Sequence, residues 1–162
     1  MHATTRFDAW VYDRMIDTQA ASLRDLARRL LASEAASQSA SQQHEAVRVC
    51  ERLQVSLTRF AGADGFTSLL RRALAMARME IPSIHHIRVK ADGSMEGLEA
   101  IAADSRDSGK STDAGTEAAI AITTNLLALL VTFVGKRITL RLVREAWPGA
   151  LLDESHERSE AP

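Results

Sequence analysis

The residues that most suggest a chemical function form the segment Ser108-Gly109-Lys110-Ser111-Thr112. This segment precedes an expected helix and has the side chains of a phosphate-binding loop. Such a loop needs an earlier glycine, so that backbone N–H groups can wrap the phosphate, and a buried strand leading into it. The position of that glycine holds Asp104, whose carboxylate would repel phosphate, and no buried strand is expected before it. We therefore interpret the segment as a polar loop with a helix cap at Thr112 or Asp113.

A metal site is the second chemistry to consider, because His85 and His86 are adjacent. Neighbouring residues of a strand point to opposite faces, so two such histidines rarely bind one ion. His44 and His156 are distant in the sequence, and Cys50 has no second cysteine at a zinc-binding spacing. We expect exposed histidines near the start of a strand, a small core cysteine, and no bound metal.

Catalytic motifs are also missing from the sequence. It has no serine nucleophile elbow, no His-Glu-x-x-His and no glycine-rich dinucleotide turn. The carboxylate pairs Asp104 with Asp107 and Glu96 with Glu99 lie in polar stretches, whereas acid–base catalysis needs surroundings that shift a carboxyl pKa. We predict no catalytic residue, no cofactor and no enzyme activity.

Composition sets the class of protein. The chain has 162 residues, 46% of them hydrophobic, and 20 Lys and Arg against 21 Asp and Glu give a net charge of −1. These values exclude a wholly disordered chain and give no global attraction to nucleic acid or anionic membranes. The single cysteine and an N-terminus without the apolar core of a signal peptide predict a cytoplasmic location. The high Ala content and the excess of Arg over Lys are typical of GC-rich bacteria.

Periodicity and the positions of Gly and Pro predict a mostly α fold, a single-domain bundle of about five helices over residues 1–149. One side of each of the first three expected helices is apolar, with Tyr12, Ile16, Leu23, Leu26, Ala27 and Leu30 in the first, Val47, Cys50, Leu53, Leu57 and Phe60 in the second, and Phe66, Leu69, Leu70, Ala73 and Ala77 in the third. The helices are expected over about residues 6–32, 44–60, 66–79, 115–134 and 138–146. Flexible connectors are expected at 33–43 and 104–113, a turn at 62–65, and a disordered tail at 150–162. A small β-hairpin is expected near 84–97, with a short helical turn over 98–103 as the alternative there.

The segment from Ala118 to Gly135 has no charged residue and is nearly long enough to span a bilayer. It also contains Thr123, Thr124 and Asn125, and it lacks an aromatic residue at its start. We therefore expect a buried central helix and no membrane insertion. Any apolar face that the chain itself leaves uncovered would serve as a partner surface.

The last two expected helices resemble a helix-turn-helix unit in one respect, since Gly135 lies in the short connection between them. Arg137, Arg141 and Arg144 could then contact phosphates. The first of the two helices is too long and too apolar for that unit, and Lys136 occupies a position where an apolar residue normally packs. A helical hairpin with a solvated basic edge is the preferred interpretation.

These observations lead us to expect a non-catalytic regulatory or adaptor protein that acts through protein–protein contact, as a homodimer formed through apolar helix surface. A DNA-binding regulator that uses the basic hairpin is the alternative, and a small-molecule sensor with a pocket between helices is the second alternative. The residues expected to interact with a partner are Leu126, Leu130, Phe133, Arg137, Arg141, Arg144 and Trp147.

Overall fold

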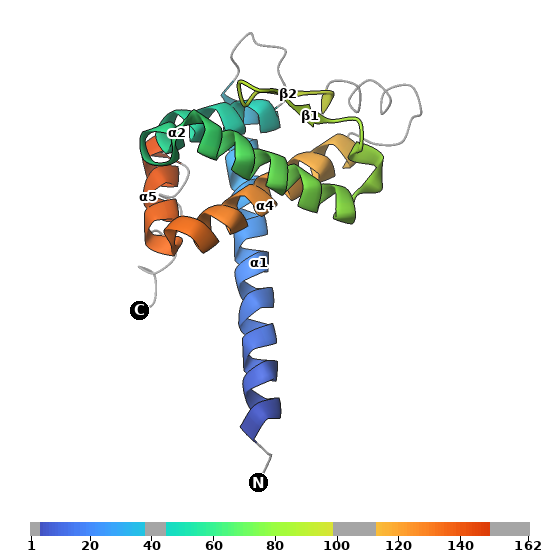
Figure 1. The fold of residues 1–162 in the computed structure, drawn as a ribbon, viewed down its shortest axis with the longest axis vertical. Helices are drawn as coiled ribbons and strands as arrows, with labels where there is room; N and C mark the ends of the chain where they lie inside the picture. The colour runs from blue at the N-terminus through green and yellow to red at the C-terminus, as the bar shows by residue number, and fades with distance from the viewer. Residues whose placement is uncertain (1–3, 38–44, 99–112, 150–162) are drawn as a thin grey trace, which may run out of the picture.

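A computed structural model describes residues 4–37, 45–98 and 113–149 of the chain. It contains four α-helices, which pack together, and a small two-stranded sheet (Figure 1). The predicted mostly α fold is thus confirmed, and the expected helices over 44–60 and 66–79 are joined across a kink into one element. The elements are α1 (Thr4–Ala36), α2 (Glu45–Glu80), the short 3-10 helix η1 (Pro82–Ile84), β1 (Arg88–Val89), β2 (Met95–Glu96), α4 (Asp113–Val134) and α5 (Lys136–Ala146).

The helix α4 lies at the centre and packs against α1, α2 and α5. Every residue from Ala118 to Leu130 is buried or half-buried, which confirms the expected central helix. Its buried amide at Asn125 donates to Glu80 Oε1 at 2.8 Å and to the Ala121 carbonyl at 2.9 Å. By length and composition alone Ala114–Val134 could cross a membrane, a test that core helices of soluble proteins also pass.

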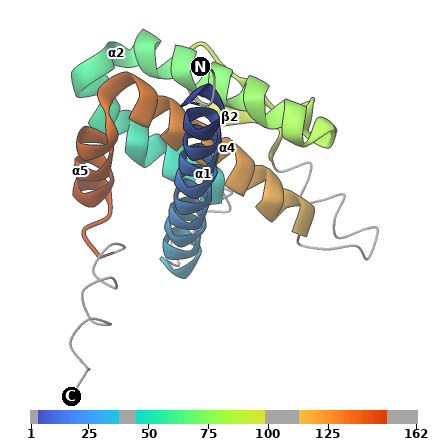
Figure 2. The same ribbon diagram turned by 90° about the horizontal axis from the view of Figure 1, so that it is seen from below.

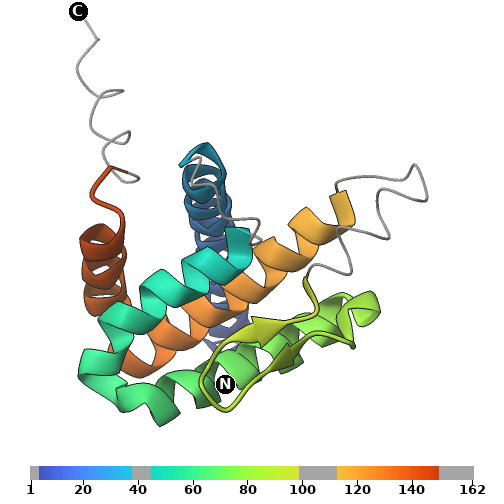
Figure 3. The same ribbon diagram turned by 90° about the horizontal axis from the view of Figure 1, so that it is seen from above.

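The helix α2 bends at a single residue, Gly62, whose φ of 72° and ψ of 169° belong to a region that only glycine adopts readily. The expected break between two helices is therefore confirmed at Gly62, but it is confined to this residue, because residues 63–65 of the expected turn are already helical. The sequence pattern suggested two helices since glycine and aspartate are frequent in turns. The two halves of α2 lie on either side of α4 (Figure 3).

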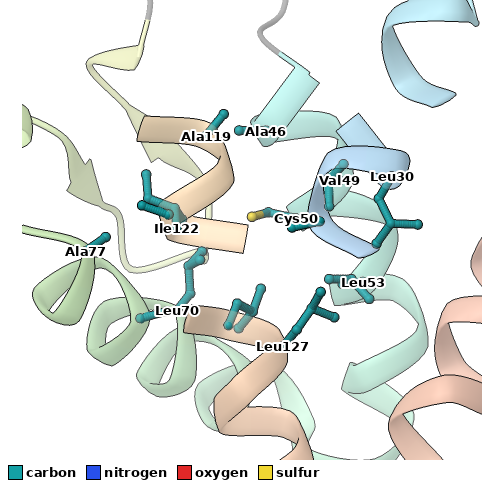
Figure 4. Close-up of a cluster of buried hydrophobic side chains, with 14 of the residues drawn as sticks. Leu30, Ala46, Val49, Cys50, Leu53, Leu70, Ala77, Ala119, Ile122 and Leu127 are labelled. Atoms are coloured by element: carbon teal, nitrogen blue, oxygen red, sulfur yellow. The ribbon is translucent and has the colours of Figure 1, made fainter. Parts of the chain in front are cut away.

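The hydrophobic core forms where α1, α4 and both halves of α2 meet (Figure 4). Leu30 comes from α1, Cys50 and Leu70 come from the two halves of α2, and Leu127 comes from α4. Most residues of the predicted apolar stripes are buried there. Among the stripe residues whose side chains the structure describes, two depart: Leu69 is half-buried, and Phe60 is 65% exposed because it lies in the last turn before the bend. The side chains of Tyr12 and Ile16 lie outside the described part.

The first helix is longer than expected and extends to Ala36, so the first part of the expected connector 33–43 is helical. Residues 38–43 lie outside the described chain. From Leu23 onwards the helix packs into the core, with Leu26, Ala27 and Leu30 buried as predicted. Its N-terminal half extends beyond the other described elements (Figures 1 and 2).

The predicted hairpin is confirmed. The strands β1 and β2 pair antiparallel, with Arg88 opposite Glu96 and Val89 opposite Met95. The turn between them is closed by Asp92, whose Oδ1 accepts bonds from the Ser94 hydroxyl at 2.6 Å and the Ser94 amide at 2.9 Å. These two bonds, the hydroxyl bond first, lower the pKa of the Asp92 carboxyl.

Candidate functional site

The helix α5 has two chemically different faces. Thr139, Leu142 and Val143 are buried against the other helices. Arg137, Arg141 and Arg144 are exposed, at the i, i+4, i+7 spacing that places residues along one side of a helix. We call these three residues the arginine row. The structure thus places the basic edge of the expected hairpin at the surface, on a helix that begins at Lys136.

Few acidic side chains offset the charge of the arginine row. Arg141 Nε lies 3.0 Å from Glu145 Oε1, one turn further along the same helix. Within residues 4–37, 45–98 and 113–149, no carboxylate lies within ion-pair distance of Arg137 or Arg144. Two of the three guanidinium groups can therefore receive an anionic partner without losing an existing ion pair.

Exposed apolar residues lie where α4 meets α5. The helices are joined by Gly135 alone, with φ 87° and ψ 154°, and this positive φ favours glycine at the short connection expected there. Phe133 precedes this glycine by two residues and is 60% exposed, and Ile138 follows it by three residues and is 44% exposed. The corner therefore combines apolar surface with the start of the arginine row.

A buried polar cluster holds the C-terminal end of α5. Its centre is Glu34 of α1, which is only 2% exposed. The Trp147 indole N–H donates to Glu34 Oε1 at 2.8 Å. Arg52 Nε lies 2.9 Å from Oε1 and Arg48 Nε lies 3.3 Å from Oε2. We call these four residues the Glu34 cluster, and it joins α1, α2 and the residue that ends α5.

The same cluster makes further contacts with the backbone and with an aromatic ring. The terminal nitrogens of Arg48 and Arg52 donate to the carbonyls of Glu34 and Ala146, at 2.6 Å and 3.2 Å. The Arg52 guanidinium also lies over the Trp147 ring, 5.8 Å from its centroid. A buried charge needs partners of this kind. The cluster therefore fixes the position from which α5 presents the arginine row.

Sequence reasoning missed this cluster because it placed Glu34 in a flexible connector. Two signals were available. Glu34 continues the apolar stripe of α1, four residues after Leu30, and a carboxylate at a core position requires basic partners. Arg48 and Arg52 lie four residues apart on one helix, which is the spacing needed to reach one carboxylate together.

The residues expected to interact with a partner divide into two groups. Leu126, Leu130 and Trp147 lie inside this chain, with at most 3% exposure. Phe133 and the arginine row lie at the surface. The structure thus brings the surface members together at one end of the molecule, along α5 and at its junction with α4.

Cys50 has the environment of a core residue, as predicted. It is 3% exposed and forms no disulfide. Burial, followed by the negative charge of Glu51, raises the pKa of the thiol from 9.0 to about 12. A nucleophilic cysteine needs the thiolate form near neutral pH, and this environment opposes it.

The two adjacent histidines contact each other and nearby backbone. Their rings meet edge to face with centroids 5.7 Å apart. His85 is exposed, as expected, whereas His86 is half-buried and its Nε2 lies 3.1 Å from the Gly97 carbonyl. In the part of the chain that the structure describes, no three His, Cys, Asp or Glu side chains lie close enough to hold a metal ion.

Several interpreted segments lie outside the described residues. They are the loop 104–112 with its phosphate-loop-like sequence, the residues Glu99, Asp104 and Asp107, the alternative helical turn at 98–103 apart from Leu98, and the tail 150–162. No protein-family model, curated protein sequence or solved structure matches this chain.

Proposed function

We propose that this chain is a small regulatory or adaptor protein that acts by binding other protein chains, and that it does so as a homodimer. The observation that carries the proposal is the N-terminal half of α1. This half extends beyond every other described element, and none of them runs beside it (Figures 1 and 2). Because no described element of its own chain packs against this half, we infer that a second chain covers it.

The sequence of this half supports the proposal. Residues 4–18 include Phe7, Trp10, Tyr12 and Ile16, which are three of the seven aromatic residues of the chain and one large aliphatic residue. Single helices of about 12–15 residues are marginal in water unless their apolar residues are packed. A second copy of the same helix supplies that packing symmetrically, and twofold dimers are the commonest closed assemblies.

Sedimentation velocity of the full chain tests this proposal. We expect a species of about twice 17.7 kDa at micromolar concentration. Phe7→Ser combined with Trp10→Ser should shift it to the monomer, because both substitutions remove apolar surface from the extended half of α1. Met79→Ser is the matched control, since Met79 is 86% exposed on α2, away from this half. A strict monomer at every concentration would refute the proposal.

The arginine row favours DNA binding as a second candidate function. Three exposed arginines on one side of a short helix can contact successive phosphates. Fluorescence anisotropy with duplex DNA tests this candidate. Binding should weaken as salt rises and should be lost when Arg141→Ala and Arg144→Ala are combined. Binding that survives either change would eliminate it.

A further inference from the structure

The arginine row is followed closely by an acidic segment of the same chain. After Pro148 and Gly149, residues 150–162 contain four acidic side chains and one arginine. Proline and glycine together are a strong signal for a reversal of chain direction. The segment therefore has both the charge and the starting point needed to return along α5.

The spacing of the acidic residues matches that of the arginine row. Asp153, Glu157 and Glu160 lie at i, i+4 and i+7, as the three arginines do. On a helix that runs back along α5, Asp153 would lie near Arg144, Glu157 near Arg141, and Glu160 near Arg137. The two members of each pair lie at nearly equal distances in sequence from the Pro148–Gly149 step.

We propose that residues 150–162 turn back at Pro148–Gly149 and bind as a helix along the arginine row, covering the basic face of α5 until a partner displaces them. The arginine row can accept the acidic side chains of this segment, because Arg137 and Arg144 have no carboxylate partner among the described residues. Arg141 keeps free donors beside its contact with Glu145, since a guanidinium carries five N–H groups.

The bound segment would be easy to displace. It has no large apolar residue after Leu152, so ion pairs at an exposed surface must hold it, and each such pair is weak and sensitive to salt. The Glu34 cluster fixes the position of α5, so binding of the segment orders the exposed arginine side chains but does not have to order the helix backbone. An acidic partner would therefore compete directly with residues 150–162 for the same three arginines.

Paramagnetic relaxation in the full chain tests the proposal. A spin label at Ser159→Cys can be attached selectively, because the native Cys50 is buried. We expect the label to broaden the amide signals of Lys136–Arg141 and to spare the second half of α2, residues 66–80. The broadening should disappear in about 1 M NaCl, where the Debye length is about 3 Å.

Charge variants make the test specific to the spacing. Combining Asp153→Lys, Glu157→Lys and Glu160→Lys should abolish the broadening, whereas Glu154→Lys, which lies off the matched spacing, should retain it. Arg141→Glu should reduce it several-fold, and Arg141→Glu with Glu157→Arg should restore it. Broadening that is absent from the start, or that persists in the triple variant or at high salt, would overturn the proposal.

One further sample separates this proposal from the homodimer. Isotope-labelled chains without a spin label are mixed with spin-labelled chains that carry no isotope. Broadening of α5 signals in that mixture would show binding to a second copy and would overturn the intrachain version. A strict monomer by sedimentation would refute the homodimer and leave the binding of residues 150–162 to α5 unaffected.

Discussion

Replacing Glu34 by alanine should cost the protein about 2–4 kcal/mol of unfolding free energy. The substitution leaves the buried Trp147 indole N–H without its acceptor, at about 1–3 kcal/mol for one buried unpaired donor. It also leaves Arg48, whose side chain is only 16% exposed, without its carboxylate. Removing one partner of a fully buried ion pair costs about 3–5 kcal/mol.

Two features keep the expected cost of Glu34→Ala below the sum of those losses. The Arg52 side chain is 47% exposed, so water can solvate its guanidinium once the carboxylate is gone. Arg48 keeps its hydrogen bond to the backbone carbonyl of residue 34, which alanine also provides. Alanine is moreover a slightly better helix former than glutamate, which returns a few tenths of a kcal/mol.

Urea unfolding followed by circular dichroism measures this change. With a slope of about 2 kcal/mol per molar urea, the midpoint should fall by about 1–2 M. Glu51→Ala is the matched control, because Glu51 is an exposed residue of α2, and such a change usually stays within about 0.5 kcal/mol. If Glu34→Ala costs no more than Glu51→Ala, the Glu34 cluster does not stabilise the fold.

Three further predictions follow from buried or strained positions. Cys50 should react with Ellman's reagent at pH 8 about 10³-fold more slowly in the folded chain than in urea, because its raised pKa of about 12 lowers the thiolate fraction. Between pH 9 and about 12 only the folded state keeps the thiol proton. The contribution of this thiol to the free energy of unfolding should therefore be fully present below pH 9 and decline as pH rises toward 12. Similar rates in both states would contradict this. Gly62→Ala should lower the unfolding free energy by about 1–3 kcal/mol through backbone strain alone, since nothing lies within 4 Å of the added Cβ; unchanged thermal unfolding would show that the bend tolerates a side chain. Thr123→Val should stabilise the fold by about 1 kcal/mol, because the fully buried hydroxyl has no partner among the described residues, and a lower midpoint in urea would disprove that reasoning.

The sequence predicted the helices, the hairpin and the arginine row, because short-range sequence patterns determine them. The periodicity of Leu, Ala and Val located the helices, and the absence of charge over 118–134 identified α4 as the central one. The pairing of β1 with β2 was predictable from the turn signal at Asp92 and Gly93. The exposed arginine row was predictable too, because its spacing is a property of α5 alone.

Features that depend on tertiary packing were not predictable from local patterns. The helix break at Gly62 was predictable from the glycine itself, whereas the path of the two halves of α2 around α4 depends on tertiary packing. Glu34 looked like part of a polar connector because its partners lie 14, 18 and 113 positions away. Phe60 follows the apolar period of α2, yet it lies where the core no longer covers that side.

The central position of α4 also determines when this protein can fold. Leu30 and Leu70 belong to the first 80 residues, and the helix that completes their packing begins at residue 113. A chain emerging from the ribosome therefore carries apolar surfaces of α1 and α2 for more than 30 residues of synthesis before α4 can cover them. During that interval those surfaces are exposed to aggregation, and chains truncated before residue 113 should be targets for chaperones or proteases.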